Sequence, residues 1–253
     1  MKKQIITAFV FGLLSVAGYG QPKTNCTITV QFAAGVPVKT DQQVFLTLTD
    51  QIDSATVVNG KASFQLQIDK PEQVRVMLHR MGNFINKSEM KWIYLDQGVV
   101  TFTITDLDSV FKGTVKGPLL TTEYEEQLRI PVDRYNLQTH LLGVAYNTAK
   151  KEKRADTTLL KDQQDQSIRA CFQVPQTYIK AHPNSSLSIV ALNFLGNGSY
   201  PMTIESLENL YNSLAEAVKN SEDGLKYAEK LRKWKEAKAL RDAKQAAALK
   251  EKA

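Results

Sequence analysis

The sequence predicts an α+β protein, in which an N-terminal antiparallel β-sandwich is followed by an α-helical bundle and a long C-terminal helix. Three observations predict this class. Residues 26–115 alternate apolar and polar positions with period two. From Gly117 and Pro118 onward, apolar residues recur with the 3.6-residue period of helices. After Gly224 there is no further glycine or proline, which suits one uninterrupted helix.

The first half contains short strand-like segments separated by turn residues. In the first of them, Ile28, Val30 and Phe32 share one face. Short strands at this spacing are typical of an antiparallel sandwich or barrel. The predicted strands are residues 27–32, 44–49, 54–58, 62–68, 73–78, 90–95 and 99–104.

Two turns predict hairpins between consecutive strands. Asn59 and Gly60 both tolerate positive φ and form a strong two-residue hairpin signal. We therefore expect the strands on either side of this turn to pair with each other. A second hairpin is expected around the turn at residues 96–98.

The second half is predicted to be helical. Two apolar stripes mark its first helices, and Pro131 predicts a break or restart within the first of them. The first stripe comprises Leu120, Tyr124, Leu128, Val132, Tyr135, Leu142 and Tyr146, and the second Leu160, Ile168, Cys171, Phe172 and Ile179.

Capping residues indicate where the later helices begin. Ser185 or Ser186 suits the N-cap of an apolar helix over residues 187–195, and Thr203 suits the N-cap of the next. The last helix is expected to start near Ser221 and to run almost to the end of the chain. Its buried face is predicted to be Leu225, Ala228, Leu231 and Trp234.

Residues 1–20 have the pattern of a cleaved secretory signal peptide. A basic head at Lys2 and Lys3 precedes an apolar run over residues 5–16, and Gly18 and Gly20 are the small residues before the expected cleavage site. We expect a mature chain that starts at Gln21, carries no lipid and works in the periplasm or outside the cell. No later segment is apolar enough to cross a membrane.

These signals divide the chain into four parts: the signal peptide (1–20), a β-sandwich domain (21–116), an α-helical region (117–235) and a basic helical tail (236–253). The formal charge of +6 arises in the C-terminal helix, since residues 225–253 hold ten Lys/Arg and four Asp/Glu. The rest of the mature chain has 20 basic and 22 acidic residues. This distribution argues against a nucleic-acid partner, which requires basic charge on a folded face.

Cys26 and Cys171 are the only cysteines, and no Cys-x-x-Cys is present. An oxidising compartment permits one disulfide between them. The alternative is that both are small buried residues. Because one belongs to the first strand and the other to a helix of the second half, we expect them to be unpaired. They are nevertheless the candidate redox residues of this chain.

Several motifs together resemble secreted bacterial thioredoxin-like proteins of the TlpA/ResA type. Residues 53–55, 59–64 and 94–98, with Pro71, are similar to the N-terminal β domain of unknown function of those proteins, and residues 178–185 are similar to their helix–Pro–Asn–Ser–helix step. The resemblance covers roughly residues 26–230. It implies a β domain followed by helices, without an established activity.

In that family the helices lead into a thioredoxin-like domain with a Cys-x-x-Cys pair. Here residues 230–235 lead instead into an Ala/Lys-rich helix. The resemblance therefore transfers no reductase residue to this sequence.

No catalytic, cofactor-binding or metal-binding constellation is predicted. His79, His140 and His182 lack the neighbouring ligand-type residues that such sites need. We expect a non-catalytic envelope protein without a cofactor, which binds another envelope protein or an unidentified ligand. The alternative is an accessory factor, or a truncated relative, in thiol–disulfide exchange.

The basic tail has two interpretations. Its apolar stripe beyond Lys235 is thin, which favours a solvated helical extension over a helix that lies on a membrane. Contact with an anionic surface is the disfavoured alternative.

Overall fold

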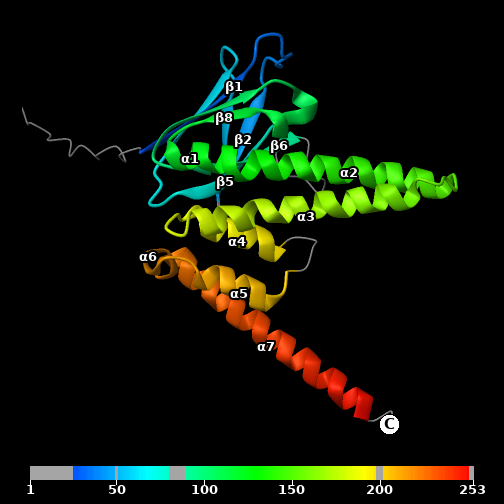
Figure 1. Ribbon diagram of the computed structural model, residues 1–253. Helices are drawn as coiled ribbons and strands as arrows, with labels where there is room; N and C mark the ends of the chain where they lie inside the picture. Colours follow the sequence, from blue (N-terminus) through cyan, green and yellow to red (C-terminus); the bar gives the residue numbers. More distant parts are fainter. Residues whose placement is uncertain (1–24, 49–50, 80–88, 198–201, 251–253) are drawn as a thin grey trace, which may run out of the picture.

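The computed structural model describes residues 25–48, 51–79, 89–197 and 202–250. The predicted signal peptide and its cleavage site lie outside these residues. The predicted α+β class is confirmed: a two-sheet β unit is followed by helices (Figure 1). None of the helices within the described ranges combines the length and the apolar character needed to cross a bilayer.

The described strands form two four-stranded sheets that pack face to face (Figure 1). The order is β4-β1-β7-β8 in the first sheet, sheet A, and β3-β2-β5-β6 in the second, sheet B. Alternate residues of both sheets meet in one core, as the period-two pattern predicts. The strands are β1 (Cys26–Phe32), β2 (Gln43–Leu48), β3 (Gln51–Thr56), β4 (Lys61–Leu66), β5 (Glu72–Met77), β6 (Met90–Leu95), β7 (Gly98–Ile104) and β8 (Thr114–Lys116).

The hairpin predicted at residues 96–98 is wrong, and the one predicted at Asn59 and Gly60 is limited to a single antiparallel bridge between Val58 and Lys61, because each turn connects one sheet to the other. Asn59 and Gly60 have positive φ, at 51° and 72°, so the predicted turn itself forms. It nevertheless leads from β3 in sheet B to β4 in sheet A. The turn at residues 96–98 likewise connects β6 in sheet B to β7 in sheet A. Strands β4 and β7 therefore both pair with β1, which is distant in sequence, whereas β3 and β6 pair with β2 and β5, the strands that precede them in the chain.

Strand β1 is central in sheet A and has one antiparallel and one parallel neighbour. Ile28 faces Phe64 of β4 in the antiparallel pair and Val100 of β7 in the parallel pair. The sandwich is thus mixed, although its other pairs are antiparallel. The parallel pair arises because the chain crosses to sheet B, where it forms β5 and β6, between β4 and β7 of sheet A.

The first long helix is continuous past Pro131. Helix α1 (Leu119–Glu123) passes into a π-helical turn, η3 (Tyr124–Arg129), and then into α2 (Ile130–Lys151). Pro131 occupies the first turn of α2. The expected restart is therefore a change of helix type rather than a break in the chain direction. Tyr124, Leu128 and Val132 of the predicted stripe are buried.

The remaining helices stack on one another below the sandwich (Figure 1). Helix α3 (Thr157–Ala181) is antiparallel to α2 and leads to α4 (Leu187–Asn197). Thr203 Oγ1 accepts a hydrogen bond of 3.1 Å from Ser206 N, which confirms the predicted N-cap of α5 (Ile204–Asn212). The short helix α6 (Glu216–Lys219) was not predicted.

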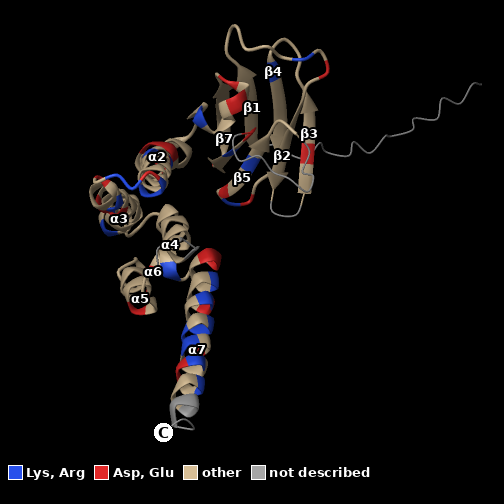
Figure 2. Ribbon diagram, turned by 90° about the vertical axis from the view of Figure 1, so that its right-hand side faces the viewer, with Lys and Arg blue, Asp and Glu red and all other residues tan. Residues whose placement is uncertain are grey.

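The last helix, α7 (Glu222–Lys250), begins against the bundle, and its C-terminal half extends away from the rest of the molecule (Figure 1). Its predicted buried face is only partly right. Leu231 is buried, but Leu225 is 57% exposed and Tyr227 takes its place in the core. The side chains of residues 235–246 are exposed, and Figure 2 shows Lys and Arg along this part of the helix.

Trp234 is the last large side chain of α7 that packs against the bundle. It meets Tyr227 edge-on, with the ring centroids 6.5 Å apart. It also covers Gly196 of α4, where an added Cβ would lie 2.5 Å from the indole ring. The apolar contacts of α7 with the bundle therefore end at Trp234, immediately before the exposed half of the helix.

We expect Trp234→Ala to lower the free energy of unfolding by about 2 kcal/mol, because the side chain is half-buried and leaves a void over Gly196. Deletion of residues 236–253 should leave the melting temperature nearly unchanged. Thermal and urea unfolding followed by circular dichroism would measure both effects. A deletion that destabilises as much as the substitution would contradict this division of the helix.

Candidate functional site

A cleft lies along the contact between sheet B and the helices, and we call it the seam cleft. Its inner end has a volume of about 290 Å³ and a mainly apolar and aromatic lining. The lining residues come from β5, β6, η3 and helices α2, α3 and α4. They are Gln73, Trp92, Tyr124, Leu128, Arg129, Val132, Pro175, Val190, Ala191, Asn193 and Phe194.

The outer end of the seam cleft is polar and has a volume of about 570 Å³. Gln73, Val190 and Asn193 line both ends, so the two hollows adjoin. Charged residues of both signs surround the outer end. They are Lys70, Glu72, Glu222, Asp223, Lys226 and Lys230.

Few polar groups face the apolar end, and most of them form hydrogen bonds or ion pairs with neighbouring side chains. Gln73 Nε2 donates a hydrogen bond of 2.8 Å to the hydroxyl of Tyr124. Burial raises the pKa of Tyr124 to about 12, so this hydroxyl stays protonated at neutral pH. Arg129 Nε lies 3.0 Å from Asp133 Oδ2. The guanidinium of Arg129 is the cationic group at this end of the cleft.

A buried ion pair fixes the helices to the sandwich beside the seam cleft. Lys91 Nζ of β6 lies 2.9 Å from Glu125 Oε2 of η3, and both side chains are 3% exposed. Lys91 Nζ also donates a hydrogen bond of 3.2 Å to the carbonyl of Phe111. Burial raises the pKa of Glu125, while the positive charge of Lys91 opposes the shift. The pair therefore acts as a polar clamp between the two halves.

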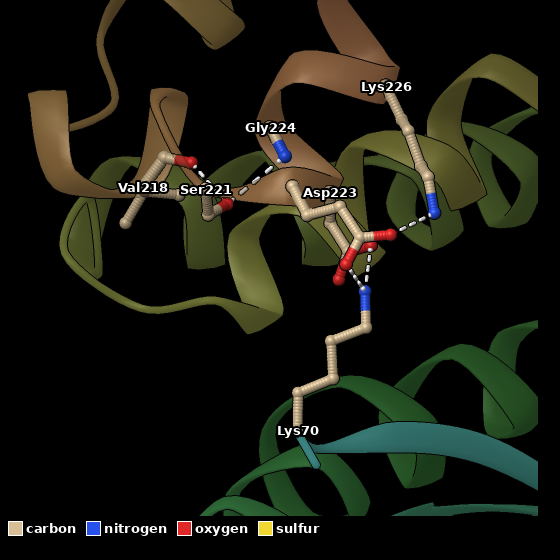
Figure 3. Close-up of polar contacts among 7 residues, drawn as sticks. Lys70, Val218, Ser221, Asp223, Gly224 and Lys226 are labelled. Atoms are coloured by element: carbon tan, nitrogen blue, oxygen red, sulfur yellow. Dashed lines mark hydrogen bonds and ion pairs between the residues drawn. The ribbon is translucent and has the colours of Figure 1, made fainter.

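A second, exposed set of ion pairs closes the outer end of the seam cleft. Figure 3 shows Lys70, from the β4–β5 connection, reaching the acidic start of α7. Lys70 Nζ lies 3.0 Å from Glu222 Oε2 and 2.8 Å from Asp223 Oδ1. Lys226, one turn along α7, also pairs with Glu222. Hydrogen bonds from Lys226 and then Lys70 lower the pKa of Glu222 to about 2.

The sequence around Ser221 explains why α7 begins at this place. Ser221 Oγ accepts a hydrogen bond of 3.1 Å from Gly224 N and thereby caps the helix (Figure 3). A Cβ at position 224 would lie 2.2 Å from the carbonyl oxygen of Val218. Glycine is therefore required for the close approach of α6 to α7. The tight turn presents Glu222 and Asp223 to Lys70.

The two candidate redox residues, Cys26 and Cys171, do not line the seam cleft and lie in different parts of the protein. Both thiols are free and buried. Cys26 lies in the sandwich core, whereas Cys171 Sγ is 3.4 Å from Asn136 Oδ1 between α2 and α3. Burial raises the pKa of each thiol to about 11. Reactive cysteines have the opposite shift.

The histidines occupy separate places. His79 lies 3.8 Å from Glu89 at the edge of the sandwich, and His140 is exposed on α2. His182 stacks on Tyr178 with ring centroids 4.5 Å apart, and its Nδ1 lies 3.2 Å from Glu123 Oε1. The described residues contain no group of three or more His, Cys, Asp or Glu side chains suited to a metal ion.

The sequence did not reveal the seam cleft. The lining of its inner end comes from six separate elements, and its aromatic residues fit the apolar patterns of those helices and strands. One signal is present in the sequence: Trp92 and Tyr94 alternate with Ile93 and Leu95, so β6 has large apolar residues on both faces. Such a strand must be covered on both sides.

Comparison with known proteins gives one family match. Residues 26–124 match the family described as a domain of unknown function, DUF4369. The matched range covers the whole sandwich and α1 and ends at Tyr124, the first residue of η3. No curated protein and no solved structure matches the chain.

We expect Lys91→Met to lower the free energy of unfolding by about 3 kcal/mol, because Glu125 would remain buried without its cation. The double variant Lys91→Met/Glu125→Met should recover most of this loss, since two apolar side chains of similar length replace the pair. A double-mutant cycle in urea measures the coupling. Additive losses would show that the two charges do not depend on each other.

We expect both cysteines to resist alkylation in the folded protein. With a pKa of about 11, only about 0.1% of each thiol is ionised at pH 8, and both are also shielded. Iodoacetamide labelling followed by mass spectrometry should modify Cys26 and Cys171 only after unfolding in urea. Rapid native labelling of Cys171 would instead support a role in thiol–disulfide exchange.

Proposed function

We propose that this protein is a non-catalytic binding protein of the bacterial envelope and that its ligand occupies the seam cleft. The observation that carries the proposal is the character of the cleft: an aromatic, apolar hollow with few polar groups, at the junction of two packed units. Ligand sites in proteins favour such junctions and such linings.

The lining suggests the chemistry of the ligand. An apolar cavity of about 150 Å³ holds benzene, so the inner end of about 290 Å³ has room for a larger apolar or aromatic body. The guanidinium of Arg129 has further N–H donors besides the Nε that lies against Asp133, and these suit an anionic group on that body. The outer end, with its charges of both signs, suits a polar remainder that reaches solvent. The ligand is thus amphipathic.

The state of the titratable groups supports binding rather than chemistry. Glu125, whose pKa is raised, is held by Lys91, and the Tyr124 hydroxyl is held by Gln73. These contacts join the sandwich to the helices. The two buried thiols, with their raised pKa values, lend no support to the alternative role in thiol–disulfide exchange.

The envelope location rests on the first twenty residues, with their basic head, apolar run and small residues before Gln21. The matching β domain has no assigned activity, which leaves the cleft as the basis of the proposal.

The proposal predicts binding of an amphipathic probe at the inner end of the seam cleft. The probe is 1-anilinonaphthalene-8-sulfonate, which joins aromatic rings to an anionic group. The measurement uses a Trp234→Phe background, so that Trp92 is the remaining tryptophan. Saturable energy transfer from Trp92 to the probe is expected, because Trp92 lines the inner end.

Val190→Phe should fill the cleft and weaken probe binding by at least about tenfold, which corresponds to about 1.4 kcal/mol. Val99→Phe is the matched control, since Val99 is exposed on β7 in sheet A, away from the cleft lining. Circular dichroism checks that both variants fold. Equal binding by the two variants would place the probe elsewhere and overturn the proposal.

A further inference from the structure

Helix α2 exposes an apolar stripe that has no partner in the described part of the chain. Its four members are Ile130, Leu137, Leu141 and Val144, each at least 46% exposed. Their spacings of seven, four and three residues place them on one helix face. Arg134 is the other residue of this face between Ile130 and Leu137. Large exposed apolar side chains in one row indicate an interaction surface.

The stripe lies on the side of α2 that faces away from α3. The α3 side is identified by Asn136, which contacts Cys171, and by Thr139, whose hydroxyl donates to Ser167. Residues 130, 137, 141 and 144 are offset from residues 132, 136, 139 and 143, which face α3, by about half a helical turn. Figure 1 shows that the α2–α3 hairpin projects past the sandwich, which leaves the stripe accessible.

The two ends of the stripe carry opposite charge. Glu126, one turn before Ile130, is exposed, and Lys151, at the end of α2, is exposed as well. Neither makes an ion pair with any described residue, whereas Arg129 and Asp133 neutralise each other. Residues 150–154 hold four basic residues and one acidic residue. The start of the stripe is therefore acidic and its end is basic.

We propose that this stripe binds a second copy of the chain, with the two α2 helices antiparallel about a two-fold axis. An antiparallel arrangement places the acidic start of each stripe against the basic end of the other, whereas a parallel one would place like charges together. This charge complementarity within one surface is the argument for a second copy, because an isologous interface must complement itself.

The register follows from the sequence. With the axis between Leu137 and Leu141, residue i of one copy faces residue 278 − i of the other. Leu137 then packs against the partner's Leu141, and Leu141 against the partner's Leu137. Arg134 lies opposite the partner's Val144, where its aliphatic stem covers apolar surface. Glu126 lies opposite the partner's Glu152, which is paired with Arg154 of its own chain, and beside the partner's Lys151, with which it can form an ion pair. This contact occurs twice.

The first test is the mass in solution. Light scattering coupled to size exclusion should give twice the chain mass of 28.3 kDa, less any cleaved segment, at concentrations of tens of micromolar. Leu141→Lys should give the monomer mass. Leu159→Lys is the matched control, since Leu159 of α3 is 58% exposed against 59% for Leu141. The control should remain dimeric.

The second test is a charge exchange. Glu126→Lys and Lys151→Glu should each raise the dimer dissociation constant by about threefold to tenfold at low salt, because each creates two like-charge contacts. The variant that carries both substitutions should restore the affinity of the original protein. This rescue distinguishes the antiparallel register from any other self-association.

A monomeric mass for the original protein at every concentration up to 200 μM would overturn the proposal. A dimer that survives Leu141→Lys, or one that Leu159→Lys disrupts equally, would place the interface elsewhere and overturn it as well. Circular dichroism of each variant shows that the monomer fold is retained. Probe binding in the seam cleft is measured separately, so the failure of either proposal would leave the other unaffected.

Discussion

Tyr94 of β6 packs against Tyr124 of η3 with the ring centroids 5.6 Å apart, and three residues earlier Lys91 pairs with Glu125 of the same helical turn. Successive residues of β6 alternate between two environments. Ile93 and Leu95 enter the sandwich core, whereas Tyr94 belongs to the helical core. One edge strand thus takes part in both cores. The position of the helices, and with it the seam cleft, depends on this strand.

The π-helical turn explains how one short segment serves both the clamp and the cleft. Tyr124, Glu125 and Leu128 are all buried within η3, and Leu128 and Arg129 line the inner end of the seam cleft. A regular helix distributes consecutive residues around its axis. The wider π turn is a common device at functional sites. In this chain the irregular turn lies where the sandwich, the clamp and the cleft meet.

The local elements of this fold follow from the sequence, and the long-range pairings do not. Asn59 and Gly60 specify a turn with positive φ, but that turn does not determine whether the next strand stays in the same sheet. Similarly, the period of α7 predicts an amphipathic helix, yet Tyr227 rather than Leu225 is buried. The tight turn at Gly224 fixes the rotation of the helix, and this constraint acts through backbone contacts with Val218. The seam cleft could not be predicted for the same reason, since its lining depends on several long-range contacts between elements.

The central position of β1 has a consequence for how the chain folds. Ile28 pairs with residues 36 and 72 positions later in the chain, namely Phe64 and Val100. The first strand to be synthesised therefore cannot complete its ladder until almost the whole β unit is available. Contacts of such sequence separation slow folding. Sheet A is therefore completed only after every strand of sheet B has been synthesised.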